Sequence, residues 1–420
     1  MKIAVIDLLA KSGFTGHTRT AVATAKALRA RGHDVIFLMR PQANTRLVEG
    51  ASFEVIRIVQ NWTGQFSRLD EQLYSLKHDC GLDLVHSFDF GGAADIVAAC
   101  KKLKIPCFFT QCADQPYKRL IKVRPLIVVS QEWKDFLVQS EGWDAEDIFV
   151  VPARMDTEVL SLDADANQLA SLKEKHNLPV DSKVILRVAR VSPQYVTSIV
   201  QGIEATARLR MQGLNVSFVH IGIRQDRWSS KYIDRCIEEA NKKCKATVAV
   251  STQEGTANAP DYISAADLVI GAGRGAFDAM LRAKPVLIVG ENGFAGTVTS
   301  TRVEELAYRN FSGRNASSER TAEESISELA DEIERLITDN VYYSEVATFG
   351  QQYVLNKLDV RLGAAQYEQI YQKYAKDMHF PADEEIRKHH VSIATYWRHR
   401  IIPESTRARL LMLLQKHGFA

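Results

Sequence analysis

The sequence lacks the features that mark several special classes of protein. Its six cysteines form no C-x-x-C pair and no finger-like spacing with histidine, so reduced, mostly buried thiols are expected instead of disulfides or a zinc site. No apolar run approaches the length of a membrane span. The cysteines concerned are Cys80, Cys100, Cys107, Cys112, Cys236 and Cys244.

Net charge is also nearly absent. The formal charge of +2 provides no broad basic surface, so no nucleic-acid partner is expected. The stretch Met1–Asp7 is typical of a strand with an acidic end and not of a signal sequence, which favours a cytoplasmic protein. With 46% hydrophobic and 25% charged residues, a chain of 420 residues has the composition and length of two soluble globular domains.

Short apolar runs alternate with amphipathic segments along most of the chain, a pattern typical of βα units on a parallel sheet. The first half predicts a helix over residues 17–31 and a complete Rossmann-like sheet. A polar stretch over 161–182 follows, and because it has no strand-like run it is the best candidate for a linker. The strands of this half are expected at 3–6, 35–38, 53–58, 82–86, 106–110, 126–130 and 149–152.

The second half repeats the same architecture. Two long helices are expected near its end, over residues 322–338 and 343–375. The expected strands are 184–188, 216–221, 247–250, 268–270 and 285–289. Two Rossmann-like sheets in one chain predict ligand binding at the carboxyl ends of the strands.

One glycine-rich segment suggests what such a ligand could be. The predicted strand 268–270 is followed by Gly271, Gly273 and Gly275, which let the backbone turn and leave N–H groups available. A helix is expected to begin near Ala276, and the N–H groups at its start, with the Arg274 guanidinium beside them, would suit a phosphate or diphosphate. Asp278 is expected in the first turn of that helix, where its carboxylate could accept hydrogen bonds from ribose hydroxyls.

Several motifs in a fixed order resemble the GT-B glycosyltransferases of the family 4 type. The resemblance runs from Met1 to about Lys376 and implies an α/β fold with two facing Rossmann-like domains and a C-terminal helical extension. It predicts domains at 1–155 and 183–355, a linker at 156–182, a helix returning to the first domain at 356–377, and a tail at 378–420. The motifs are Ala266-Asp267, Asp278-Ala279-Met280, Lys284-Pro285-Val286, Arg187–Pro193, Val151–Asp156, Asp83–Ser87 and the segment from Gly13 to Val35.

The resemblance also implies roles for individual residues. Arg190 and Arg274 would stabilise the donor diphosphate, and His86 is a further catalytic candidate. The family pattern has a lysine where Tyr195 stands and a second histidine where Phe88 stands, so one cation and one polar group are missing. Other expected contacts, which would line the nucleotide-sugar and acceptor sides of a cleft, are Gly13, Gly16, Gly271, Gly273, Gly275, Asp278 and Arg314, with Asp89 as a polar alternative to Phe88.

The tail combines apolar, aromatic and basic residues. Leu410–Leu414 form an apolar run flanked by arginines, and Tyr396-Trp397 precede it. Such a segment suits the surface of an anionic membrane or a partner subunit, which would place the protein on the inner face of a membrane. The alternative is that the tail folds back and extends the core.

The resemblance implies a retaining glycosyltransferase that moves a sugar from a nucleoside diphosphate donor, most simply a UDP-sugar. The acceptor would be a saccharide or a lipid-linked acceptor in cell-surface polysaccharide or glycoconjugate assembly. No cofactor is expected, and because no Asp-x-Asp pair lies in a loop after a strand, no metal is expected either. Two alternatives stay open: a non-catalytic subunit that binds a partner glycosyltransferase, and a nucleotide-sugar epimerase, for which no carboxylate set is apparent.

Overall fold

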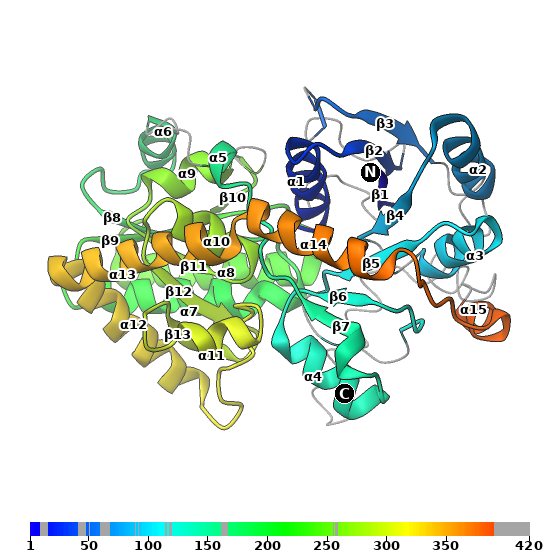
Figure 1. The fold of residues 1–420 in the computed structure, drawn as a ribbon. Coiled ribbons are helices and arrows are strands. Elements are labelled where there is room, and N and C mark those ends of the chain that lie inside the picture. The colour runs from blue at the N-terminus through cyan, green and yellow to red at the C-terminus, as the bar shows by residue number, and fades with distance from the viewer. Residues whose placement is uncertain are drawn as a thin grey trace. The chain divides into compact units, whose positions relative to one another are not determined.

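The protein forms two compact α/β units, which agrees with the predicted class. The computed structural model describes residues 1–8, 16–40, 48–49, 51–58, 68–88, 90, 92–113, 116, 120–160, 167–254, 256 and 259–389. Among the described residues, the first unit contains Met1–Asp156 and 357–389, and the second contains Thr157–Asn356. Figure 1 shows the elements of each unit.

The first unit is built on a parallel sheet in the order β3-β2-β1-β4-β5-β6-β7. Strands β1, β2, β4, β5 and β6 are buried on both faces, as the short apolar runs predicted, whereas the edge strands β3 and β7 are partly exposed. In β1, Ala4 and Ile6 enter one hydrophobic cluster while Ile3 and Val5 enter the other. The strands are β1 (Lys2–Asp7), β2 (Asp34–Met39), β3 (Glu54–Arg57), β4 (Leu84–Ser87), β5 (Cys107–Gln111), β6 (Leu126–Val128) and β7 (Ile148–Val150).

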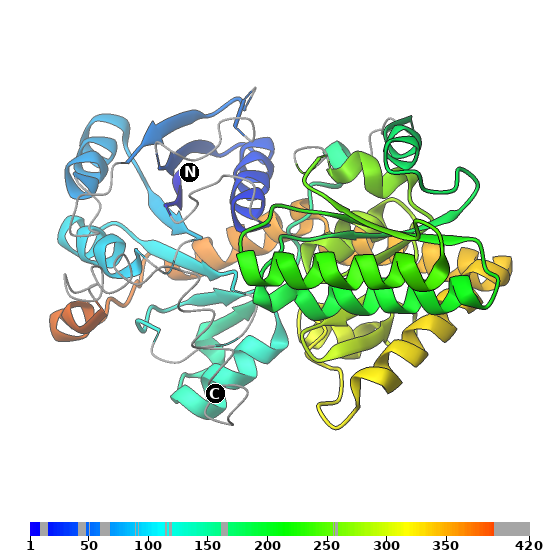
Figure 2. The ribbon, with the colours of Figure 1, turned by 180° about the vertical axis from the view of Figure 1, so that it is seen from behind.

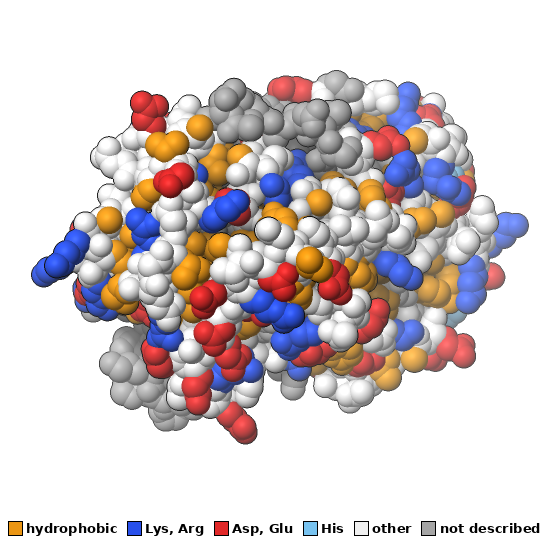
Figure 3. Space-filling model, turned by 90° about the vertical axis from the view of Figure 1, so that its left-hand side faces the viewer, with side chains coloured by type: hydrophobic (Ala, Val, Ile, Leu, Met, Phe, Trp, Pro, Cys, Tyr) orange, Lys and Arg blue, Asp and Glu red, His pale blue; other side chains and the backbone are white. Residues whose placement is uncertain are grey.

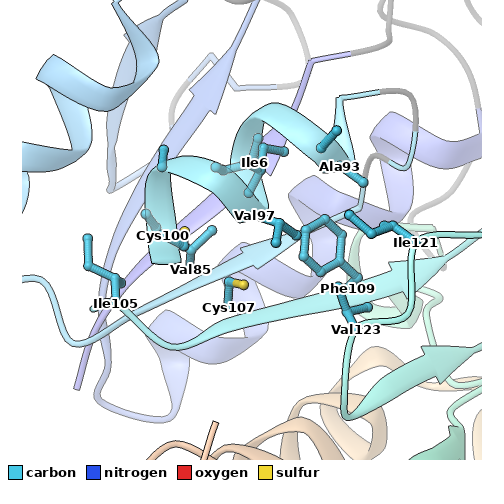
Figure 4. Packing of buried hydrophobic residues seen from close by; sticks show 14 of the residues in the cluster. Ile6, Val85, Ala93, Val97, Cys100, Ile105, Cys107, Phe109, Ile121 and Val123 are labelled. Atoms are coloured by element: carbon cyan, nitrogen blue, oxygen red, sulfur yellow. The ribbon is translucent and has the colours of Figure 1, made fainter. Parts of the chain in front are cut away.

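Helices cover both faces of this sheet. On one face, α2 (Leu69–Cys80), α3 (Ala93–Leu103) and α4 (Gln131–Glu141) contribute to the first cluster. Figure 4 shows Val97 and Cys100 of α3 directed at Val85 and Phe109 of the strands below. On the other face, α1 (Gly16–Ala30) packs along α14 (Val360–Tyr374).

The second unit has a sheet in the order β10-β9-β8-β11-β12-β13. Its first five strands are parallel, but β13 pairs antiparallel with β12 and was not predicted. Gly293, at φ 103°, allows the tight reversal between these two strands. The strands are β8 (Lys183–Val188), β9 (Val216–Ile221), β10 (Ala249–Thr252), β11 (Leu268–Gly271), β12 (Val286–Gly290) and β13 (Gly293–Thr297).

Three long helices share the main apolar cluster of this unit. They are α7 (Pro193–Met211), α8 (Arg227–Cys244) and α12 (Ala322–Thr338), and Figure 2 shows the first two, in green, side by side. The helix predicted over 322–338 is α12, and in the structure Thr321 and Glu324 form a reciprocal capping box at its start. The shorter helices are α9 (Ala259–Ala265), α10 (Arg274–Leu281), α11 (Val303–Tyr308) and α13 (Asn340–Tyr353).

The single helix expected over 343–375 is interrupted. A π-helical turn, Val354–Leu358, follows α13, and Asp359 then caps α14 by accepting a hydrogen bond from the N–H of Arg361 at 2.7 Å. The interruption has a structural use, since the carbonyl of Leu358 accepts the N–H groups of Arg154 and Met155 at 2.9 and 2.8 Å. An uninterrupted helix would keep that carbonyl in its own hydrogen-bond ladder.

The stretch expected to be a linker contains helices. It includes α5 (Thr157–Leu160) and α6 (Asn167–Lys175), and α6 packs on α9. Leu169 and Leu172, three residues apart and so on one face of α6, are both buried. The polar composition of this stretch reflects the exposed side of a short helix.

The first part of the predicted tail belongs to the core of the first unit. In α15 (Asp383–His389), Ile386 is 4% exposed and joins the cluster beneath α3, and Phe380 packs against the same cluster. The Lys101 ammonium donates to the carbonyl of Pro381 at 2.9 Å and pairs with Asp383 at 2.6 Å. For residues 380–389 the structure agrees with the alternative in which the tail folds back and extends the core. The remaining part, with Tyr396, Trp397 and the apolar run 410–414, lies outside the described residues.

The surface mixes charges of both signs. On the face shown in Figure 3, basic side chains lie among acidic ones, as the small net charge predicts. Within the described parts of the chain, no helix combines the length and the hydropathy needed to cross a membrane.

Candidate functional site

The glycine-rich segment forms a tight strand-to-helix turn at the carboxyl edge of the second sheet, the edge where the parallel strands end. Strand β11 ends at Gly271, Gly273 is the N-cap of α10 with φ 52°, and the helix begins at Arg274. A Cβ on Gly271 would lie 2.9 Å from the Cα of Ala276. Only glycine at position 271 therefore allows α10 to pack this closely on the strand that precedes it.

Few of the N–H groups in this turn remain available to a ligand. Gly273 donates its N–H to the carbonyl of Phe311 at 2.8 Å, and Ala276 donates to the carbonyl of Gly273 at 3.1 Å. The N–H of Gly275 has no acceptor among the residues that the structure describes. A Cβ on Gly275 would have the carbonyl of Val188 as its nearest neighbour, at 3.9 Å. The amide at Gly275 is therefore the best placed to meet an anion.

Asp278 does not occupy the first turn of this helix. Because α10 begins at Arg274, two residues earlier than expected, Asp278 is its fifth residue and is 5% exposed. The positive φ of Gly273, 52°, lets the chain turn directly into the helix, without the extra loop residues that the prediction assumed. The predicted ribose contact at Asp278 would need this buried side chain to become accessible.

Arg314 lies near the same edge through a second loop. Gly313, at φ 80°, approaches Gly290 at the end of β12 so closely that a Cβ on it would lie 2.3 Å from the Gly290 nitrogen. The same loop supplies the Phe311 carbonyl that binds Gly273. Arg314, which is half-buried, therefore lies on a loop that is hydrogen-bonded to the glycine turn.

Arg190 follows β8 and is exposed. The Cζ atom of its guanidinium lies 5.5 Å from the ring centre of Tyr195, within the range of a cation–π contact. Tyr195 belongs to the first turn of α7, at the position where the family pattern has lysine. The tyrosine therefore brings no charge of its own but contacts a cation.

Arg187 is a second cation at this edge, and the sequence analysis did not single it out. The side chain is 2% exposed, its Nε donates to the hydroxyl of Ser198 at 3.1 Å, and one Nη donates to the carbonyl of Ile270 at 3.4 Å. Its Cζ lies 5.7 Å from the ring centre of Tyr195. Burial lowers the pKa of Arg187 to about 10, so the group stays charged at neutral pH.

The partners of Arg187 are neutral. In the described parts of the chain no carboxylate forms an ion pair with it. A buried guanidinium without a counter-charge is costly, so an anion bound nearby would stabilise this arrangement. One sign of this residue was visible in the sequence, since an arginine interrupts the otherwise apolar strand Val184–Val188.

Arg187 and the glycine turn meet at the topological switch point of the second sheet. Strand β8 lies between β9 and β11, and the chain winds in opposite directions from these two neighbours. Arg187 lies on β8, and the carbonyl that it binds belongs to Ile270 on β11. Open α/β sheets bind ligands in the crevice at this point, so the residues gathered there form the candidate site.

His86 lies elsewhere, in the core of the first unit. It is fully buried, its Nε2 is 2.8 Å from the hydroxyl of Thr110, and its Nδ1 is bonded to the hydroxyl of Tyr371. Burial lowers the pKa of His86 to about 3. Phe88, which replaces the second histidine of the family pattern, stacks on the imidazole of His86, with 4.5 Å between the two ring centres. Both ring nitrogens bond hydroxyl groups inside the core, which favours a structural role for His86 over the catalytic role predicted.

Two further predicted features are located as follows. Asp267 of the Ala-Asp motif precedes β11 at the opposite edge of the sheet, where it accepts the N–H of Val184 at 2.8 Å and pairs with Lys183 at 2.9 Å. Its role is to hold two strands together. Gly16 is exposed as the first residue of α1, whereas Gly13 and Asp89 lie outside the described residues.

Comparison with known proteins agrees with this fold. Residues 14–159 match the sequence model of Glycosyltransferase Family 4, so the predicted resemblance is confirmed over that segment. No curated protein matches the sequence closely enough to be a relative.

Solved structures extend the likeness to most of the chain. A glycosyltransferase from Rickettsia africae ESF-5 is similar with a TM-score of 0.66 at 16% identity, over 90% of this chain and 99% of that one. HepE (Alr3699) of Anabaena, in complex with UDP and glucose, gives 0.63 at 17% identity over 89% and 100%. A putative UDP-N-acetylglucosamine 2-epimerase from Listeria monocytogenes gives 0.56 at 12% identity over 91% and 98%. At these identities the likeness establishes the GT-B fold.

Proposed function

We propose that the protein is a glycosyltransferase that binds a UDP-sugar through the carboxyl edge of its second sheet. The observation that carries the proposal is the buried cation Arg187, placed at the switch point beside the glycine turn. With Arg190 and Arg274, it would neutralise the negative charge that develops on a departing nucleoside diphosphate. The structure of HepE with UDP and glucose supports a UDP-sugar as donor.

Arg187 can replace the positive charge that is lost because Tyr195 stands where the family pattern has a lysine. The family pattern places a lysine there, and its loss would leave Arg190 without a second cation. Both arginines lie within 6 Å of the Tyr195 ring, at 5.7 and 5.5 Å, so two positive charges are retained around this position. Arg187 thus supplies the positive charge that the family pattern places at position 195, and the site stays positive.

The finer features of the proposed reaction follow the family resemblance. The transfer would retain the configuration of the sugar and need no metal, because arginines and a helix N-terminus would stabilise the diphosphate. The acceptor would be a saccharide or lipid-linked group in cell-surface polysaccharide or glycoconjugate assembly. Association with a membrane surface belongs to the same proposal.

The second candidate function is a non-catalytic subunit that supports a partner glycosyltransferase. Two observations favour it: Tyr195 replaces the expected lysine, and the predicted catalytic His86 is enclosed in the core. The charge at Arg187 opposes it, because a protein without an anionic ligand gains nothing from a buried cation with neutral partners. An epimerase lacks support from any carboxylate set identified in the sequence.

The decisive experiment incubates the purified full chain with UDP-, GDP- and ADP-sugars and measures binding by calorimetry and donor hydrolysis by chromatography. We expect binding of UDP and turnover of one UDP-sugar that survives EDTA. Replacing Arg190 or Arg274 by alanine should weaken UDP binding by about 1.5–3 kcal/mol each. Arg208, which pairs with Glu323 on the surface, is the matched control. Unchanged UDP affinity in both variants would reject the proposed site, and activity restored only by manganese would reject metal independence.

A further inference from the structure

A buried histidine in the second unit bonds the backbone just before Arg190. His220 lies on β9 and is fully buried, and its Nε2 donates to the carbonyl of Ala189 at 2.8 Å. Because a carbonyl oxygen can only accept, this bond fixes the ring proton on Nε2 and leaves Nδ1 as an acceptor. The hydroxyl of Ser251 on β10 donates to Nδ1 at 2.8 Å. The imidazole therefore connects β10 and β9 to the loop that follows β8.

His220 is a polar residue in a mostly apolar strand. Its neighbours Phe218, Val219 and Ile221 are buried and apolar, and a leucine would fill the place of His220 at a lower cost of desolvation. Burial lowers the pKa of His220 to about 4, so the ring is neutral at physiological pH and has one N–H to donate. What the imidazole adds at this position is therefore the hydrogen bond between its N–H and the loop after β8.

The carbonyl of Ala189 lies in a confined space. A Cβ on Gly222 would lie 1.6 Å from this oxygen, so only glycine at position 222 leaves room for it. The same Cβ would lie 3.1 Å from Nε2 of His220. Gly222 provides the room and His220 provides the donor, and together they fix the direction of this carbonyl.

Backbone hydrogen bonds hold the chain on both sides of Arg190. Ala189 donates its N–H to the carbonyl of Ile221 at 3.1 Å. Val191 donates its N–H to the carbonyl of Ile223 at 2.8 Å. Arg190 makes none of these bonds, so the direction of its exposed side chain depends on how firmly its two neighbours are held. His220 adds a side-chain bond to this framework, at the residue directly before the arginine.

We propose that His220 is a positioning residue that directs Arg190 toward the diphosphate of the donor. This inference rests on the proposed glycosyltransferase function, in which Arg190 binds the diphosphate, and adds the residue that fixes the geometry of that contact. A guanidinium binds phosphate oxygens through hydrogen bonds of defined direction, so a displacement of about 1 Å weakens them. His220 does not touch the donor, and acts on it through the carbonyl of Ala189.

The test measures the UDP affinity of the full chain by calorimetry. His220→Leu removes the donor at similar volume and should weaken UDP binding about three- to tenfold, the factor that one neutral hydrogen bond is worth. His220→Gln can still donate to the Ala189 carbonyl and accept from Ser251, so it should bind UDP within about twofold of wild type.

Asn241→Leu is the control for loss of a polar side chain from the same unit. Asn241 accepts the N–H groups of Val248 and Ala249 at 2.8 and 3.0 Å. These bonds lie at the start of β10, away from the carboxyl edge of the sheet. Asn241→Leu should therefore lower the melting temperature and leave UDP affinity unchanged.

A double-mutant cycle separates positioning from a general structural role. If His220 acts through Arg190, His220→Leu should cause no further loss of UDP affinity in a chain that already carries Arg190→Ala. The inference is overturned if the two losses multiply, or if His220→Leu alone lowers the melting temperature and binds UDP like the wild type.

Ser251→Ala makes the same test if His220→Leu does not fold. It removes only the hydroxyl that holds Nδ1 of His220, so UDP binding should weaken by about twofold or more, and only while Arg190 is present. Wild-type affinity in Ser251→Ala would then overturn the inference. A wild-type chain that fails to bind UDP, or an Arg190→Ala variant that binds it as tightly as wild type, would instead count against the proposed function, and the inference would fall with it.

Discussion

The guanidinium Cζ of Arg187 lies 5.7 Å from the ring centre of Tyr195. This contact joins a buried cation on β8 to the first turn of α7, and the same guanidinium binds the carbonyl of Ile270 on β11. Three elements that converge on the switch point are therefore held by one charged side chain. A charge in that position is costly to the folded protein and favourable to an anionic ligand, so stability and binding should respond in opposite directions when it is removed.

The first prediction follows from this opposition. Replacing Arg187 by methionine removes the charge and keeps most of the volume, so the melting temperature should stay level or rise. The affinity for UDP should fall by about tenfold, or roughly 1.4 kcal/mol. Calorimetry and thermal unfolding on the same samples check both effects.

Arg224 offers a matched control for that variant. It lies in the same unit but forms a partly exposed ion pair with Asp234 at 2.7 Å, so Arg224→Met should lower stability by about 1 kcal/mol or less and leave UDP affinity unchanged. If Arg187→Met lowers stability while UDP binding is retained, Arg187 is a structural residue and the site must be placed elsewhere.

The glycine turn gives a second prediction with an internal control. A methyl group on Gly271 would lie 2.9 Å from the backbone of Ala276, whereas one on Gly275 would have its nearest neighbour at 3.9 Å. Gly271→Ala should therefore reduce the free energy of unfolding by about 1–3 kcal/mol, as overpacking does in a close-packed core. Gly275→Ala should leave stability nearly unchanged.

Ligand binding should separate these two variants again. If the amide of Gly275 meets the diphosphate, the added methyl group should weaken UDP binding although the protein remains stable. Chemical denaturation gives the stabilities and calorimetry gives the affinities. Wild-type affinity in Gly275→Ala would show that the ligand does not approach this amide.

The sequence predicted the fold well because its signals are local. Buried parallel strands appear as short apolar runs, and long helices such as α12 appear as amphipathic segments. The missed strand β13 contains three small residues in five, Gly293, Ala295 and Gly296, which carry little strand signal. The long helix over 343–375 was predicted without its break, because the pairing of Leu358 with residues 154 and 155 is made across about 200 positions of sequence.

The candidate site was predicted less completely, because a local sequence motif does not show which residues are buried or which distant residues they contact. His86 follows the family pattern by position, but the hydroxyl of Tyr371 that occupies its ring lies 285 residues away. Arg187 was overlooked because the role of a charged residue within a strand can be assigned only when its partners in the folded protein are known. The glycine turn was predicted correctly as a turn, since its conformation depends on neighbouring residues alone.

A third prediction concerns the end of the described chain. Truncation after Asp377 removes Ile386 and Phe380 from the core of the first unit and leaves apolar surface of α3 exposed. The free energy of unfolding should drop by roughly 2–5 kcal/mol, the cost of deleting one large buried side chain with partial relaxation. Truncation after His389 keeps these contacts and is the control. Equal stability of the two truncated chains would show that α15 is dispensable for folding.

The last prediction is the acid sensitivity of the fold. Burial lowers the pKa of His86 to about 3 and that of His220 to about 4, whereas both groups titrate near 6.5 in the unfolded chain. Below pH 6.5 the unfolded state therefore binds more protons than the folded state, so stability falls as the pH is lowered from about 6.5 toward 4. Each histidine should contribute a slope of about 1.4 kcal/mol per pH unit.

A glutamine in place of His86 cannot titrate and can still bond the hydroxyls of Thr110 and Tyr371. His86→Gln should therefore reduce the dependence of unfolding free energy on pH by about 1.4 kcal/mol per unit between pH 6 and 4. The same substitution at the exposed His78 is the control. Urea denaturation at a series of pH values measures the slopes. Equal slopes for wild type and His86→Gln would mean that His86 can be protonated in the folded protein, which would return it to the set of candidate ligand contacts.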